Sequence, residues 1–186
     1  MKIFISGGCK NGKSYYAQRL AKAQRTNPLY YIATMRPADA EDDERILRHR
    51  FERGGWGFTT IEQSADVENI LNKCELGGSF LLDSVTALLA NEMFPPGGGV
   101  NEKAAEKIVN GLSQIIDNIS NIVIVSDYIY SGAFIYDPLT EKYRRSLAET
   151  DRVSAKKCDV VLEAAYTNVI VHKGGEVFGE LYAKIL

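Results

Sequence analysis

Residues 7–14 read Gly-Gly-Cys-Lys-Asn-Gly-Lys-Ser, and their types and spacing match the phosphate-binding pattern G-x-x-x-x-G-K-S. Glycines let successive backbone N–H groups turn toward phosphate oxygens, and the N-terminus of a following helix adds partial positive charge. Lys13 would reach the outer phosphates of a nucleotide, and the Ser14 hydroxyl would bind Mg²⁺. An apolar run at residues 2–5 precedes the loop and a helical segment follows it, which favours a nucleotide site over a chance glycine-rich turn. The predicted nucleotide contacts come from Gly7, Gly8, Cys9, Lys10, Asn11, Gly12, Lys13 and Ser14.

A Mg²⁺ ion at such a loop usually has an acidic partner at the end of a buried strand. Two aspartates qualify, because Asp83 follows the apolar residues 80–82 and Asp127 follows the apolar run at residues 122–125 and Ser126. Either aspartate could instead cap the helix that comes next. We favour Asp83 as the metal ligand, since it lies in the middle of the chain between two well-marked units.

A second group of reactive side chains lies on a predicted helix over residues 41–53. Arg45, His49 and Arg53 are spaced four residues apart and share one helix face. Like charges at this spacing repel one another and do not stabilise the helix. The same face would suit the binding of a polyphosphate. A neutral imidazole held there could attack phosphorus. On the pattern alone, a solvated basic face with a surface histidine remains the alternative, and His172, the other histidine, lies in a predicted strand and is interpreted as structural.

The elements that must position these residues alternate between strands and helices. Continuous apolar runs predict strands buried on both faces, which indicates an α/β fold: a P-loop NTPase-type, mostly parallel sheet with helices on both faces. Ligands then bind at the carboxyl ends of the strands. We expect one domain over residues 1–186, with an edge strand or an oligomer contact after residue 174. The predicted strands are residues 2–5, 29–33, 58–61, 80–82, 122–125, 160–162 and 169–171.

Composition narrows the class of protein further. The net charge of −2 over 186 residues argues against a nucleic-acid binder that works by bulk charge. Three scattered cysteines, Cys9, Cys74 and Cys158, have no metal-ligand spacing and predict a reducing compartment, hence the cytoplasm. No apolar stretch is long enough to span a bilayer, and no signal peptide is expected.

Taken together, these residues resemble the bifunctional adenosylcobinamide kinase / adenosylcobinamide-phosphate guanylyltransferase family of cobalamin assembly. The P-loop by itself is generic, whereas the other shared segments are much more specific. The resemblance covers most of the chain. The residues that carry it are 6–14, 31–34, Arg45, Ile46, His49, Arg50, Arg53, Trp56, Thr60, Glu62, 82–86 and 91–94.

The resemblance implies roles for particular residues. His49 matches the histidine that is guanylylated during GMP transfer, and Asp83 falls where the family has an acidic residue. The implied substrates are GTP, with ATP as another phosphoryl donor, and the corrinoid adenosylcobinamide, and the implied assembly is a trimer with its active site near a subunit boundary. The residues that would line the nucleotide site are Ala33, Thr34, Met35, Arg50, Phe51, Glu52, Arg53 and Glu62.

The chain departs from the family pattern at three places. Gly54-Gly55 follow Arg53 where the family usually has proline, Asp127-Tyr128 stand where it has Asn-Glu, and residues 151–154 replace an Asn-Gln pair. Two of these lie in the C-terminal half, which would face the corrinoid. Two rival functions therefore remain: a small-molecule kinase in which His49 only binds phosphate, and a non-catalytic nucleotide-binding module.

Overall fold

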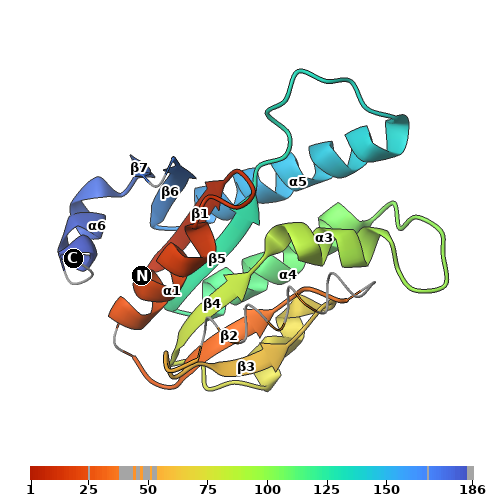
Figure 1. Ribbon diagram of the computed structural model, residues 1–186. Coiled ribbons are helices and arrows are strands. Elements are labelled where there is room, and N and C mark those ends of the chain that lie inside the picture. The colour runs from red at the N-terminus through yellow and green to blue at the C-terminus, as the bar shows by residue number, and fades with distance from the viewer. Residues whose placement is uncertain are drawn as a thin grey trace.

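A computed structural model describes residues 1–24, 26–37, 44, 47, 51, 54–166 and 168–183. These described residues form a seven-stranded sheet with the strand order β3-β2-β4-β5-β1-β6-β7 (Figure 1). Neighbouring strands are parallel except β6 and β7, which are antiparallel. The strands are β1 (Lys2–Gly7), β2 (Leu29–Ala33), β3 (Thr59–Glu62), β4 (Ser79–Asp83), β5 (Asn121–Asp127), β6 (Val160–Ala165) and β7 (Asn168–Lys173). The helices are α1 (Lys13–Ala23), the 3₁₀ helix η1 (Val67–Asn72), α3 (Val85–Met93), α4 (Ala104–Asn118), α5 (Pro138–Lys157) and α6 (Gly175–Tyr182).

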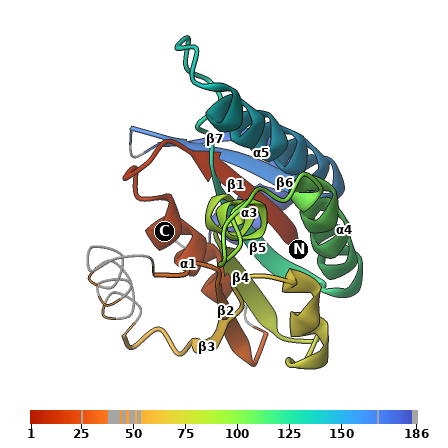
Figure 2. The same ribbon diagram turned by 90° about the vertical axis from the view of Figure 1, so that its right-hand side faces the viewer.

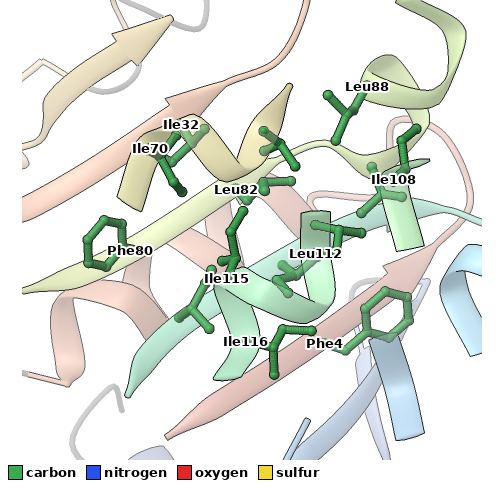
Figure 3. Close-up of a cluster of buried hydrophobic side chains, with 14 of the residues drawn as sticks. Phe4, Ile32, Ile70, Phe80, Leu82, Leu88, Ile108, Leu112, Ile115 and Ile116 are labelled. Carbon is green, nitrogen blue, oxygen red and sulfur yellow. The ribbon is translucent and has the colours of Figure 1, made fainter. Parts of the chain in front are cut away.

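The central strands are buried on both faces because successive side chains point to opposite sides of a sheet. In β5, Ile122 and Ile124 join the apolar cluster under α3, α4 and η1, whereas Val123 and Val125 join the cluster under α1 and α6. Figure 2 shows α4 and α5 on one side of the sheet and α1 on the other, and Figure 3 shows the first cluster. Each fully buried Val, Leu or Ile contributes roughly 1.5–3 kcal/mol, so the two clusters fix the sheet that carries the site.

Local signals set the helix boundaries near the site. The Asp137 carboxylate accepts hydrogen bonds from the backbone N–H groups of Leu139 and Thr140, and Pro138 occupies the first turn of α5. At the start of α3 the Ser84 hydroxyl accepts from Ala87 N–H at 3.3 Å. The dipeptide Asp137-Pro138 is typical of such a helix start, with an N-cap residue followed by proline at the first helical position.

The α/β architecture predicted from the sequence is confirmed, with a mostly parallel sheet and helices on both faces. For the segment after Gly174 the edge-strand alternative was wrong, because Gly175–Tyr182 form helix α6, while an oligomer contact there stays a prediction. Phe178 and Leu181 provide the physical reason, since they are buried against the α1 side of the sheet. Among the described helices, none is both long and apolar enough to cross a membrane.

The predicted helix over residues 41–53 is described at three positions only. Glu44, Leu47 and Phe51 are helical and exposed. Its other residues, His49 included, lie outside the described residues.

Candidate functional site

Strand register brings the predicted site residues to one edge of the sheet. Gly7 at the end of β1 is the direct partner of Asp127 at the end of β5. Two strands further on, Ala33 of β2 pairs with Asp83 of β4 on one side and with Glu62 of β3 on the other. All five residues therefore lie at the carboxyl ends of parallel strands, where this class of sheet binds ligands.

The P-loop leaves β1 at Gly7 and enters α1 at Lys13, and two of its glycines are needed for its shape. Gly12 has φ of 83°, which an L side chain rarely adopts. A Cβ on Gly7 would collide with the backbone oxygen of Ala164 in β6. The Asn11 amide binds that same oxygen, and its own oxygen accepts from Lys13 N–H at 3.2 Å. The loop is thus anchored to β6 as well as to β1.

Lys13 is buried at the base of this loop and has two partners among the described residues. Its ammonium group donates to the backbone oxygen of Gly8 at 3.0 Å and forms an ion pair with the Asp127 carboxylate. Asp127 is held in turn, because its N–H donates to the Thr86 hydroxyl at 2.8 Å. A nucleotide phosphate would have to compete with Asp127 for this lysine.

Asp83 is held differently. Its carboxylate accepts a 2.8 Å hydrogen bond from the Tyr31 phenol of neighbouring β2. Ser14 is half-buried on the first turn of α1. A hydroxyl and a carboxylate are oxygen ligands, which suit Mg²⁺ together with phosphate oxygens and waters. No cluster of three or more His, Cys, Asp or Glu side chains with metal-binding geometry occurs within the described part of the chain.

Thr34 has a supporting position in the structure. Its buried hydroxyl donates to Ser84 O and accepts from Ser84 N–H, both at 2.7 Å. Its own carbonyl accepts from the Asn91 amide at 2.7 Å, and that amide also reaches Ser64 O at 3.0 Å. These bonds lock the turn after β2 to the end of β4. Ala33 and Met35 flank it and are half-buried, while Glu62 is exposed on the outermost strand.

The remaining predicted residues are only partly placed. Phe51 is 87 % exposed, and Cys9 and Lys10 are exposed in the P-loop. His49, Arg50, Glu52 and Arg53 lie outside the described residues, so their roles stay predictions.

Three side chains near the site have contacts that their sequence motifs did not predict. Tyr31 donates to Asp83, Thr86 accepts from the backbone N–H of Asp127, and Asp151 accepts from the Ser126 hydroxyl. Of these three side chains, only Asp151 could have been identified from the sequence. Its spacing from Leu147 and Ser154 places it on the buried face of α5, where a carboxylate is unexpected.

A glycine loop between a buried parallel strand and a helix, at the carboxyl edge of a mostly parallel sheet, defines the P-loop NTPase class. The family model of cobinamide kinase / cobinamide phosphate guanyltransferase, CobU, matches residues 3–167. The chain therefore belongs to this enzyme family, which confirms the resemblance noted from its residues and supports a role in cobalamin biosynthesis with nucleotide as a substrate.

One curated relative is the bifunctional adenosylcobalamin biosynthesis protein CobP of Pseudomonas aeruginosa. It is 27 % identical over 161 residues, which cover 87 % of this chain and 91 % of CobP.

Two solved structures are also similar in outline. A KaiC-like protein from Pyrococcus horikoshii has 12 % identity and a TM-score of 0.49, over 92 % of this chain and 77 % of that one. The flagellar accessory protein FlaH from Methanocaldococcus jannaschii has 14 % identity and a TM-score of 0.46, over the same shares. Nothing about function follows from likeness at this level.

Proposed function

We propose that this chain catalyses two reactions: phosphorylation of adenosylcobinamide, and transfer of GMP from GTP to the resulting phosphate through a guanylyl-histidine. The observation that carries the proposal is the placement of Lys13, Asp127 and Asp83 at one sheet edge around an intact P-loop. Membership of the CobU family supports the pair of substrates.

In the kinase step, the P-loop N–H groups and Lys13 bind the phosphates of GTP or ATP. Lys13 exchanges Asp127 for phosphate oxygens as the nucleotide enters. A corrinoid side-chain hydroxyl attacks the γ-phosphorus and releases its proton to solvent, while the bond to the β-phosphate oxygen breaks and GDP or ADP leaves. Ser14 and Asp83 would hold Mg²⁺, which neutralises charge on the phosphates.

In the transfer step, a neutral His49 imidazole attacks the α-phosphorus of GTP, and pyrophosphate leaves. The phosphate of the corrinoid then attacks the same phosphorus and displaces the imidazole. Splitting the transfer in two replaces one difficult displacement with two easier ones. The residues that would line this nucleotide site are Ala33, Thr34, Met35, Arg50, Phe51, Glu52, Arg53 and Glu62.

We further propose that residues 1–186 act as one domain, that the working assembly is a homotrimer, and that it acts in the cytoplasm. A trimer with sites at subunit boundaries would bring a second chain near the corrinoid.

The test is a turnover assay with cobinamide and GTP labelled separately at the α- and γ-phosphates. We expect γ-label in cobinamide phosphate first and α-label in GDP-cobinamide later. Transfer of γ-label alone would reduce the function to a kinase, and transfer of neither label would leave a nucleotide-binding module.

A further inference from the structure

A buried polar cluster lies at the end of β5, beside the strand β1 that leads into the P-loop, and has no role in the proposed reactions. Its centre is Asp151 of α5, which is 3 % exposed. Asp151 Oδ2 accepts hydrogen bonds from the Ser126 hydroxyl at 2.9 Å and from the Tyr130 phenol at 3.0 Å. Its other oxygen, Oδ1, is buried without a hydrogen-bond partner among the described residues. An incompletely bonded buried carboxylate is costly, so it needs an explanation.

The cluster is connected to the phosphate-binding lysine through one residue. Ser126 immediately precedes Asp127, whose carboxylate pairs with Lys13. Ser126 is also the strand partner of Ser6, which is the last residue before the P-loop glycines. Asp151 therefore supports the end of β5 at the place where Asp127 meets the lysine.

The titratable groups around Asp151 come from several elements. Asp127 lies on β5, Tyr130 on the following loop, and Tyr143 on α5 itself, while Lys13 reaches the group through Asp127. Arg152 on α5 acts on Tyr130 rather than on Asp151 directly. Burial raises the pKa of Asp151 to about 7; the hydrogen bonds from Ser126 and Tyr130 oppose this rise, and the nearby Asp127 charge adds to it.

Asp127 and Asp151 thus repel each other when both are ionised, and the effect is reciprocal. An ionised Asp151 makes Asp127 a stronger partner for Lys13. When a nucleotide takes Lys13 away, Asp127 loses its counter-charge, and the neighbouring Asp151 then favours its neutral form.

We propose that Asp151 is a positioning residue for phosphoryl transfer: it holds the end of β5 through Ser126, and its charge state sets how strongly Asp127 competes with the nucleotide for Lys13. The inference rests on the proposed contact between Lys13 and phosphate. It does not depend on the corrinoid or on His49.

Nucleotide binding tests the proposal without turnover. The affinity for GTP in excess Mg²⁺ is measured by calorimetry between pH 6 and pH 8.5. We expect wild-type affinity to fall by about threefold or more as pH rises through about 7, with proton uptake on binding near pH 7. Asp151→Asn should abolish this fall in affinity with pH. Subtracting the affinity-against-pH curve of Asp151→Asn from that of wild type removes the contribution of the titration of GTP itself.

Glu149→Gln is the matched control, because Glu149 is an exposed carboxylate on the same helix. It should keep the wild-type profile. A merely structural role for Asp151 would change affinity equally at every pH. The proposal is overturned if Asp151→Asn keeps the wild-type pH dependence or if wild type has none.

Tyr130→Phe provides a second test that does not require Asp151→Asn to fold. It removes one donor to the carboxylate, so the inflection should move to higher pH. A ¹³C-labelled aspartate carboxyl signal should titrate near pH 7 in the free protein. An unmoved inflection, or no aspartate signal titrating above the ordinary range near 4, contradicts the proposal. Failure of the two-step function would instead appear as missing label transfer while this pH dependence persists.

Discussion

Two neighbouring strands, β4 and β5, end in aspartates at the same edge of the sheet, yet the two carboxylates are held in opposite ways. Asp127 is paired with a cation inside the protein, the ammonium group of Lys13. Asp83 is bonded by the neutral phenol of Tyr31, which orients the carboxylate without cancelling its charge. We infer that Asp127 keeps the lysine in place before nucleotide arrives, while Asp83 retains its charge for a metal that arrives with the nucleotide.

The largest expected effect comes from removing the cation of this pair. Lys13→Ala deletes the ammonium group aimed at the outer phosphates, so both reactions should fall by about a thousandfold or more. Lys22→Ala, at the exposed end of the same helix, is the control and should retain activity. Near-normal turnover by a folded Lys13→Ala protein would remove the nucleotide-site assignment.

The comparison between the two aspartates is tested by neutralising each in turn. Asp83→Asn keeps the shape and loses the charge, so Mg²⁺-dependent activity should fall about a hundredfold with a higher Mg²⁺ requirement. Asp127→Asn should leave the Mg²⁺ requirement unchanged, because its charge serves Lys13. Activity titrated against Mg²⁺ distinguishes them, and a larger metal effect in Asp127→Asn would mean that the metal binds at the end of β5.

A smaller effect is expected on the unfolding free energy, through the buried carboxyl group of Asp151 beside β5. The pKa of Asp151 is raised from 3.8 to about 7 in the folded protein, so the native state binds the extra proton between these values. The contribution of Asp151 to the unfolding free energy should therefore fall as pH rises from about 4 to about 7, by on the order of 2–4 kcal/mol. Urea unfolding of Asp151→Asn should show a flatter profile over this range, while Glu149→Gln should follow wild type. Equal slopes in wild type and Asp151→Asn would show that burial does not shift this carboxyl group.

Local patterns were sufficient to predict much of this molecule. The P-loop, the aspartates that end strands β4 and β5, and the cap at Asp137 each depend on a few consecutive residues. The buried runs on both faces follow from continuous apolar sequence, which is typical of parallel sheets.

The pairing of side chains across the site could not be predicted in the same way. Lys13 meets Asp127, and Tyr31 meets Asp83, because the strand order places β5 beside β1 and β4 beside β2. No local pattern encodes that order. Helix α6 was not predicted because Phe178 and Leu181, which are buried in it, offer a single apolar spacing. One spacing is not enough to distinguish the repeat of a helix from that of a strand.

The central claim, transfer of GMP through a protein histidine, has one direct measurement. Wild-type protein incubated with α-labelled GTP and Mg²⁺ should acquire label that is lost in acid and survives in alkali, because protonation of the phosphoramidate nitrogen makes that bond labile. His49→Asn should acquire no label while it still transfers the γ-phosphate to cobinamide, since the P-loop is unchanged. An alkali-labile label, or a label that persists in His49→Asn, would contradict the claim and assign the nucleophile to another residue.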